Sequence, residues 1–260
     1  TTPEATIAAV ATLIKTMVAD QSGMLTGLGI AAFGPLDIDP GSKTYGSILK
    51  TTKPGWSDVD LRRRFATALG VDVAVDTDVN GALRAEMKWG AAQDTPSAAY
   101  ITIGTGIGAG IYAGGDYLGR PSHPEFGHIR IQRHRDDLNF AGVCPFHGDC
   151  LEGLASANAI WERFGDPQAM APDHPGWEIE AFYLAQACLS LTLLCRPEKI
   201  ILGGGLMQAQ HLLGLVHDHY STLMNGYLEL RDEAVQELIV RPGLKDQAGL
   251  MGGVALALTL

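Results

Sequence analysis

The sequence lacks the features that attach a chain to a membrane. No run of apolar residues is long enough to cross a bilayer, and the longest candidate, residues 249–260, is better read as a buried helix. No positively charged stretch leads into an apolar stretch, so nothing indicates a secretory signal. We therefore expect a cytoplasmic protein with no membrane partner.

Positive charge is also scarce. The chain has 19 Lys and Arg residues against 29 Asp and Glu residues, and its formal net charge is -10. The densest basic run is Arg62-Arg63-Arg64, which is typical of a solvated helix face. Because a net negative chain repels nucleic-acid backbones, nucleic acid is not an expected partner.

Cysteine is rare, with four residues. Cys188 and Cys195 share one apolar helical pattern, where cysteine behaves as a small buried hydrophobe. Cys144 and Cys150 instead flank His147 at equal spacing in CPFHGDC. A disulfide, a metal site and chance packing are the three alternatives for this pair. A reducing cytosol disfavours the disulfide, and packing alone rarely places two cysteines around a histidine, so the pattern favours a metal.

The metal that this pattern indicates is zinc. Cys-x2-His-x2-Cys and one upstream histidine together supply two thiolates and two imidazoles, which is a donor set that tetrahedral Zn²⁺ accepts. The upstream candidates for the fourth ligand are His123, His128 and His134.

The composition is otherwise that of a folded globular protein, with 46% hydrophobic and 18% charged residues. Its apolar periodicity alternates between helix and strand, which predicts an α/β architecture. The polar stretch QDTPS marks a boundary between lobes of residues 1–94 and 95–260. Helices are expected at residues 4–18, 56–69, 80–88 and 178–194, and strands at residues 27–33, 71–75, 99–103, 109–113 and 199–202.

Two glycine-rich turns follow predicted strands. ITIGTGIGAG neither opens a helix, as a dinucleotide fingerprint must, nor contains the Gly-Lys-Ser/Thr of a P-loop. It predicts a hairpin with Gly104-Thr105-Gly106 at the tip, either a plain tight turn or a phosphate cradle. Gly203-Gly204-Gly205 is either an ordinary strand-to-helix turn or a point of close ligand approach. Taken together, the two turns favour a single nucleotide site.

Asp76 and Asp78 stand where a predicted strand meets a predicted helix. Either can be the N-cap of that helix. Alternatively, a carboxylate at the carboxyl end of a strand faces the crevice in which α/β proteins bind ligands, where it can accept a proton from a substrate hydroxyl.

The motifs VDTDVN, ITIGTGIGAG, EFGH, CPFHGDCLEGLAS and IILGGG, in their observed positions, resemble those of the ROK family. This family comprises sugar kinases and repressors of the actin-like ATPase superfamily. The resemblance extends over nearly the whole chain, and SHPEFGH followed by CPFHGDCLEGLAS is similar to the fructokinase branch. It implies a two-lobed actin-like (ribonuclease H-like) α/β fold with a zinc-bound loop, whose last helix packs back on the N-terminal lobe. It also implies transfer of the γ-phosphate of ATP, with Mg²⁺, to the 6-hydroxyl of a hexose, fructose being the expected one.

The resemblance also implies roles for individual residues. Asp78 matches the base that deprotonates the 6-hydroxyl, and His128 matches a residue that binds sugar and ligates zinc, ahead of His123 and His134. Because protein fills all four positions, the zinc has a structural role and holds the loop that carries Glu152. The matching positions are Glu125, His128, Glu152, Gly34, Pro35 and Trp56 for the sugar, Thr105, Gly106, Gly204 and Gly205 for the nucleotide, and His128, Cys144, His147 and Cys150 for zinc.

One feature of the family has no counterpart in this chain. Its Asp-x-Gly-Gly-Thr turn, which holds ATP phosphates and organises Mg²⁺, would precede Thr1. We therefore expect an unpaired strand edge and exposed apolar surface in the first lobe. The alternatives to a fructokinase are a kinase for glucose, mannose or N-acetylhexosamine, and a non-catalytic sugar-binding relative. Relatives are commonly dimers, so a homodimer is expected.

Overall fold

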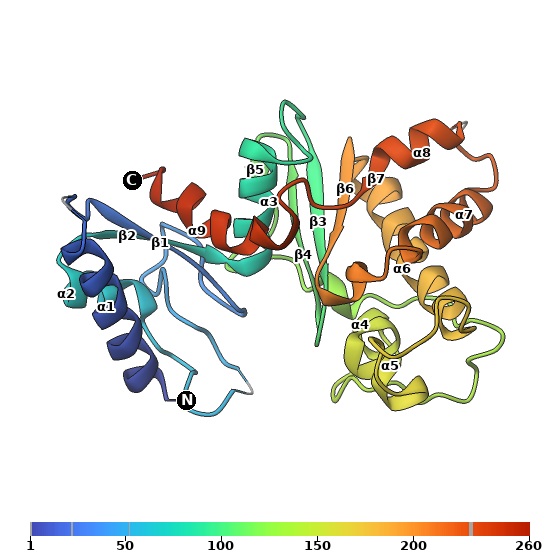
Figure 1. Ribbon diagram of the computed structural model, residues 1–260, viewed down its shortest axis with the longest axis horizontal. Helices are drawn as coiled ribbons and strands as arrows, with labels where there is room; N and C mark the ends of the chain where they lie inside the picture. Colours follow the sequence, from blue (N-terminus) through green and yellow to red (C-terminus); the bar gives the residue numbers. More distant parts are fainter. Residues whose placement is uncertain (1, 22, 52, 229–230) are drawn as a thin grey trace.

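The protein, described by a computed structural model over residues 2–21, 23–51, 53–228 and 231–260, has two lobes (Figure 1). The N-terminal lobe contains α1 (Pro3–Ala19), β1 (Gly27–Ala32), α2 (Leu61–Leu69) and β2 (Asp72–Thr77). The strands of the second lobe are β3 (Ala98–Ile103), β4 (Ile107–Ala113), β5 (Asp116–Tyr117), β6 (Lys199–Gly203) and β7 (Ile239–Val240). The remaining helices are α3 (Asp78–Trp89), η1 (Phe126–His128), α4 (Leu151–Ala155), α5 (Ala157–Phe164), α6 (Gly176–Cys195), η2 (Gly205–Gln208), α7 (Leu212–Met224), α8 (Asp232–Leu238), η3 (Lys245–Gln247) and α9 (Ala248–Ala257).

The strands form two sheets, which confirms the predicted α/β class. β1 and β2 pair in parallel, with Ala32 opposite Thr77 at their carboxyl ends. The larger sheet has the order β5-β4-β3-β6-β7, in which β3 is antiparallel to β4 and parallel to β6. Each sheet therefore brings the carboxyl ends of two parallel strands to one edge, where α/β proteins bind ligands.

Helices cover both faces of the larger sheet (Figure 1). Ile101 and Ile103 of β3 point into the core that α6 and α7 complete. Tyr100, which points to the opposite face, packs with Leu83 of α3. This alternation along β3 is the two-residue period of a strand that is buried on both sides. The sheet is therefore a rigid layer between two groups of helices.

The second helix begins later than its apolar pattern predicts. α2 starts at Leu61, and residue 56 lies outside it. Asp60 is the N-cap, because its carboxylate accepts a hydrogen bond from the Arg63 N–H at 2.8 Å. Residues 56–60 instead belong to the loop before the helix, and Trp56 lies on this loop.

Apolar surface remains exposed on the N-terminal lobe. Val10 and Met17 of α1 have exposed fractions of 38% and 57%, whereas Ile7 of the same helix is buried. Leu250 and Leu258 are also exposed, so the prediction of a buried helix over residues 249–260 is only partly right. Among the described residues β1 pairs with β2 alone, so the expected unpaired edge and exposed apolar surface are both found.

α6, and not the C-terminal tail, is the longest apolar segment. It is the one helix in the described part of the chain whose length and composition would allow it to cross a membrane, contrary to the sequence expectation. More than half of its apolar window is buried inside the protein, with Leu184 and Cys188 fully covered. The core helix of a soluble protein can have the same length and apolar composition, so this helix is weak evidence for a membrane.

α9 packs against β1 through two glycines. A Cβ on Gly29 would overlap the backbone of Gly253 and lie 2.5 Å from the Ala257 nitrogen. The last helix thus returns to the strands of the N-terminal lobe.

We predict that Gly29→Ala lowers the free energy of unfolding by about 1–3 kcal/mol, because the helix must move off the strand. Gly249→Ala is the matched control, since a Cβ there has nothing within 4 Å, and it is expected to add up to about 1 kcal/mol of helix stability. Chemical denaturation of both variants checks this, and equal stabilities would contradict the packing argument.

Candidate active site

The Asp78 carboxylate is not used to cap its helix. Thr77 is the N-cap of α3 and accepts a hydrogen bond from the Asn80 N–H, so the prediction that Asp76 or Asp78 has this role is wrong. Asp76 is buried and accepts hydrogen bonds from Asn80 Nδ2 at 2.8 Å and from Arg84 at 3.2 Å. Asp78, in the first turn, accepts a hydrogen bond from the Val79 N–H through Oδ1, at 2.9 Å. Its carboxylate therefore keeps acceptor capacity for a ligand.

The start of α3 lies against β4. A Cβ on Gly108 would lie 3.3 Å from Val79 Cγ1, and one on Gly110 would lie 2.7 Å from the Val79 carbonyl oxygen. The two glycines therefore allow the helix to approach the strand closely. This approach packs Val79, the residue after Asp78, against the first half of β4, which follows the turn.

The pKa of Asp78 is raised above its usual value. Its side chain is open to solvent, but surrounding protein atoms partly desolvate the carboxylate, and this burial is the largest effect. The Val79 N–H, His123 and Lys53 lower this pKa and so act in the opposite direction. A carboxylate whose pKa is raised in this way accepts a proton more readily than an ordinary aspartate.

The predicted hairpin is confirmed, with its tip between β3 and β4. The Gly104 N–H donates to the Gly106 carbonyl at 3.0 Å, and Thr105 is exposed at the tip. Glu152 Oε2 accepts a hydrogen bond from the Ile107 N–H at 2.9 Å. A Cβ on Gly106 would lie 2.6 Å from the same carboxylate oxygen. Glu152 therefore ties α4 to this turn, which the sequence did not reveal.

The second glycine turn lies directly beside the first. Gly204 has a φ of 91°, and a Cβ there would overlap the backbone of Ile103 at the end of β3. Only glycine fits this close contact without strain. Gly205 has nothing within 4 Å of a Cβ position, so its backbone is open to a ligand. η2 follows the turn, and α7 comes after it.

The four predicted zinc ligands come together. The ligand atoms of His128, Cys144, His147 and Cys150 all lie within 4.8 Å of one another. His128 Nδ1 lies 3.4 Å from Cys150 Sγ and 3.7 Å from Cys144 Sγ, and His147 Nδ1 lies 3.7 Å from Cys144 Sγ. Ligand bonds of about 2.0–2.3 Å give tetrahedral edges of roughly 3.3–3.8 Å, so these distances fit zinc. His123 and His134 are outside the cluster.

The Cys150 thiol also needs a cation to become a ligand. Burial, with a smaller contribution from the neighbouring Cys144, raises the pKa of the Cys150 thiol to about 11. A thiolate at neutral pH is therefore unfavourable here unless a metal stabilises it. Both the donor set and its spacing fit a structural metal site.

A buried ion pair holds the loop that enters this cluster. Arg163 Nη1 donates to Asp137 Oδ2 at 2.7 Å, and both side chains are 6% exposed. The Tyr183 hydroxyl donates to the same oxygen at 2.7 Å. α5 and α6 therefore fix the loop between His128 and Cys144 at its middle.

The predicted sugar-side residues lie where β1 and β2 end. The Phe33 and Trp56 rings meet edge to face with centroids 5.5 Å apart, beside the Gly34-Pro35 cis peptide. Lys53 Nζ lies 3.3 Å from the centre of the Phe33 ring. Glu125 is exposed immediately before η1, which carries His128. Sequence reasoning missed Lys53, although it lies three residues before Trp56 in the TTKPGW stretch.

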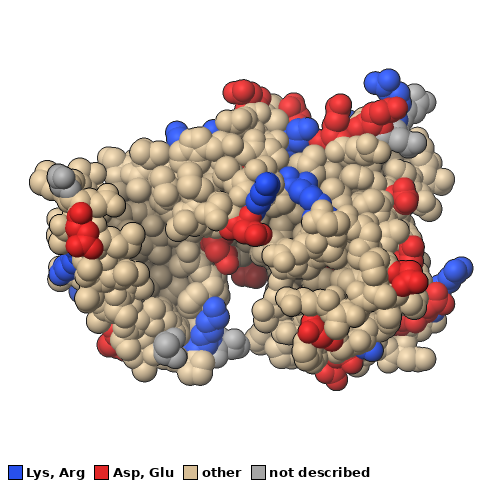
Figure 2. Space-filling view, viewed as in Figure 1, with Lys and Arg blue, Asp and Glu red and all other residues tan. Residues whose placement is uncertain are grey.

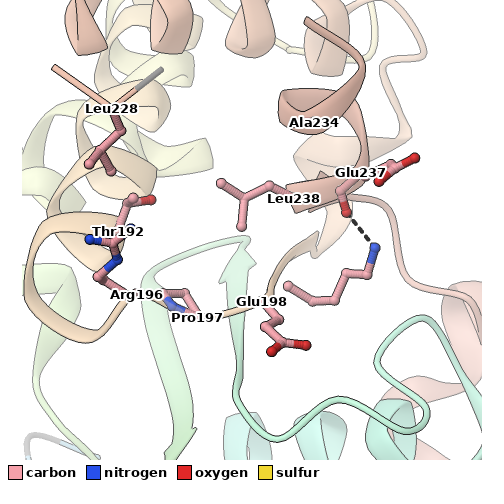
Figure 3. A pocket seen from close by; sticks show the side chains of 9 residues that line it. Thr192, Arg196, Pro197, Glu198, Leu228, Ala234, Glu237 and Leu238 are labelled. Atoms are coloured by element: carbon pink, nitrogen blue, oxygen red, sulfur yellow. Dashed lines mark hydrogen bonds between the residues drawn. The ribbon is translucent and has the colours of Figure 1, made fainter. Parts of the chain in front are cut away.

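A hollow separates the two lobes on one side of the molecule. Figure 2 shows the molecule hollowed between the part with α1 and α2 and the part with α4 and α5, with acidic side chains at the inner end. A different cavity, of about 430 Å³, lies at the amino end of β6 (Figure 3). It is lined by Arg196, Leu228, Leu238 and neighbours, and none of the predicted site residues contributes to it. It is therefore separate from the candidate active site.

Two lobes around a hollow and adjacent glycine turns at the edge of a central sheet describe an α/β protein, and its structural neighbours give it the actin-like ATPase fold. The chain belongs to the ROK family, whose model matches residues 1–259.

Known proteins agree with this assignment. The fructokinase of Zymomonas mobilis subsp. mobilis is 42% identical over 261 residues, covering 99% of this chain and 86% of that protein. The crystal structure of a ROK hexokinase from Thermus thermophilus has a TM-score of 0.79 and 26% identity, covering 99% of this chain and 87% of that chain. A ROK glucokinase from Streptomyces griseus, in complex with glucose and AMPPNP, has a TM-score of 0.76 and 23% identity, covering 100% of this chain and 89% of that chain.

Proposed function

We propose that this protein is an ATP-dependent fructokinase in which Asp78 accepts the proton of the fructose 6-hydroxyl during phosphoryl transfer. The observation that carries the proposal is the packing of Val79 against Gly108, since it brings the residue after Asp78 to the start of the strand that follows the Gly104-Thr105-Gly106 turn. A base next to a phosphate-binding turn is the arrangement that transfer from ATP to a hydroxyl requires. The fructokinase name of the Zymomonas relative supports fructose as the hexose.

We assign the sugar to the segment that follows β1, the loop with Trp56, and the residues around η1 and α4. Carboxylates hold hydroxyl-rich ligands well because each oxygen accepts hydrogen bonds. Glu152 uses Oε2 for the Ile107 N–H, which leaves Oε1 for the sugar. The proposed sugar contacts are Glu125, His128, Glu152, Gly34, Pro35 and Trp56.

We assign the nucleotide to the two glycine turns. Thr105 and Gly106 offer a hydroxyl and unobstructed backbone to the phosphates, and Gly204 and Gly205 offer open backbone to the adenosine. Mg²⁺, which neutralises phosphate charge during transfer, is expected to arrive with ATP and to be held largely by phosphates and water.

We propose that zinc bound by His128, Cys144, His147 and Cys150 has a structural role. Its four protein ligands leave no position for a reacting water. Cys150 directly precedes α4, so the metal fixes the helix that carries Glu152. We also propose a cytoplasmic location and a homodimer.

The first test is hexose-dependent ADP release with Mg-ATP. Fructose, glucose, mannose and N-acetylglucosamine are compared at equal concentration, with the intact mass of the sample recorded. We expect the highest kcat/KM with fructose. Turnover that is higher with another hexose would reassign the substrate, and no turnover with any hexose would overturn the kinase proposal for this chain.

The raised pKa of Asp78 predicts a particular pH dependence. As pH falls through that pKa the base becomes protonated, so kcat/KM should fall with a midpoint above about 4, the usual value for aspartate. Because the positive charge of Lys53 lowers the Asp78 pKa, Lys53→Met should move the midpoint to higher pH. Lys50→Met is the control and should leave it unchanged. A shift to lower pH would contradict the electrostatic argument.

A further inference from the structure

His123 lies on a loop that joins the two lobes. The loop follows β5 in the second lobe, but its backbone and side chains bond to the segment after β1. The Ile38 N–H donates to the Pro121 carbonyl at 2.7 Å, and the Leu36 N–H donates to Ser122 Oγ at 3.3 Å. His123 is thus held against the residues that follow Gly34 and Pro35.

The imidazole of His123 fills the space between the end of β1 and the start of β4. A Cβ on Gly34 would lie 2.8 Å from His123 Cε1, and a Cβ on Gly108 would lie 3.9 Å from His123 Nε2. Gly108 is also the residue that Val79 contacts, and His123 acts electrostatically on Asp78. The ring therefore lies at the junction of the proposed sugar contacts, the base and the strand that follows the phosphate turn.

The hydrogen bonds of this imidazole are incomplete. His123 is 9% exposed, and its Nδ1 is buried with no hydrogen-bond partner among the described residues. By contrast, His217, which has a purely structural position, bonds through Nε2 to the Ile239 carbonyl at 2.8 Å. A buried polar atom without a partner is unfavourable, so its presence at a ligand site indicates that the bound state supplies a partner.

Metal binding and simple packing fit the surroundings of His123 less well than ligand binding. The histidine does not belong to the group of metal-binding atoms, which contains His128 instead. Packing would be served by an apolar side chain of similar size, without the unpaired nitrogen. A polyhydroxylated ligand satisfies an imidazole in either tautomer, because a hydroxyl both donates and accepts.

We propose that His123 is a specificity-determining contact of the hexose site, which binds through its ring a sugar hydroxyl other than the one that Asp78 deprotonates. This proposal rests on the proposed function, since it assumes a sugar between Gly34 and Asp78. A site built around a hydrogen bond to one hydroxyl discriminates strongly against sugars that lack or misplace it. Gly34 then has a second role, since it leaves the space that the imidazole occupies.

The test combines substitutions with sugars that each lack one hydroxyl. Fructose and its four analogues missing the hydroxyl at carbon one, two, three or four are compared on the wild type, His123→Ala, His123→Asn and His217→Ala. We expect His123→Ala to lower kcat/KM for fructose about 10- to 100-fold, chiefly through KM. For the analogue that lacks the contacted hydroxyl, the kcat/KM values of the wild type and of His123→Ala should agree within about twofold. His123→Asn, which keeps a donor and an acceptor, should recover part of the loss.

Several results would overturn the proposal. If His123→Ala lost the same factor in kcat/KM on fructose and on every analogue, His123 would have a structural role. Any loss of kcat/KM in His217→Ala is expected to follow this uniform pattern. Full activity of His123→Ala with fructose would also overturn it. Thermal denaturation of each variant identifies those that fail to fold. If His123→Ala does not fold, the kcat/KM values of His123→Asn, the smaller change, decide the role of His123.

Calorimetric titration of the same sugars separates this proposal from the proposed function. If the wild type binds fructose but transfers no phosphate, the kinase proposal falls, and the analogue affinities of His123→Asn still decide the role of His123. If the wild type binds none of the sugars, both proposals fall.

Discussion

Replacing Asp78 with asparagine is expected to lower kcat for phosphate transfer by about 10²- to 10⁴-fold while the affinity for hexose hardly changes. Asparagine has the same shape but cannot accept the hydroxyl proton, and the base acts mainly in the transition state. Steady-state kinetics and calorimetric hexose binding on the same sample measure the two effects separately. A loss of hexose affinity as large as the loss of kcat would mean that Asp78 binds substrate and is not the base.

The stability of this variant is a second measurement. Because burial raises the pKa of Asp78, the folded chain binds the proton more tightly than the unfolded chain. The stability contribution of this group therefore decreases as pH rises above the unfolded pKa, and the ionised form is unfavourable at neutral pH. Asp78→Asn should melt at the same temperature as the wild type or higher, whereas the exposed control Asp72→Asn should have little effect. A lower melting temperature for Asp78→Asn would contradict this assignment of the shift.

Removal of zinc is expected to weaken hexose binding at least about tenfold. The prediction applies to prolonged chelation and to Cys150→Ser, because Cys150 is fully buried and immediately precedes the helix with Glu152. Loss of one ligand frees this helix, so both the Glu152 carboxylate and the Ile107 N–H that it binds should lose their fixed positions. Metal analysis should give one zinc per chain for the wild type and much less for Cys150→Ser.

Cys195→Ser is the matched control for the zinc prediction. Cys195 lies at the end of α6, is half-buried, and takes no part in the cluster. It should keep its zinc and its hexose affinity. Unchanged affinity in metal-free wild-type protein would show that the metal is dispensable to the sugar site.

The metal cluster and the hairpin could be predicted from the sequence because their signals are local. Cys144, His147 and Cys150 lie within one short loop, and Gly104 to Gly106 lie between two strands that are adjacent in the chain. In contrast, the environment of His123 arises from contacts with Gly34 and Gly108, which are distant in sequence. No local pattern reports such a contact, so from the sequence His123 is only a candidate metal ligand.

Element boundaries show the same distinction. The capping of α3 by Thr77 was missed because Asp76 and Asp78 are equally good caps by residue type. The side-chain bonds of Asp76 to Asn80 and Arg84 show that Asp76 is not the cap. The exposed face of α1 could not be foreseen from its periodicity. An apolar stripe shows that a helix is amphipathic, but what covers that stripe depends on the neighbouring elements.

The contact between Gly204 and Ile103 also bears on how the site is assembled. Because β3 and β6 pair directly and this contact joins their ends, the two glycine turns have a fixed separation before any ligand arrives. Under the assignment of the nucleotide proposed above, ATP would therefore meet a preorganised surface and lose little affinity to the ordering of loops.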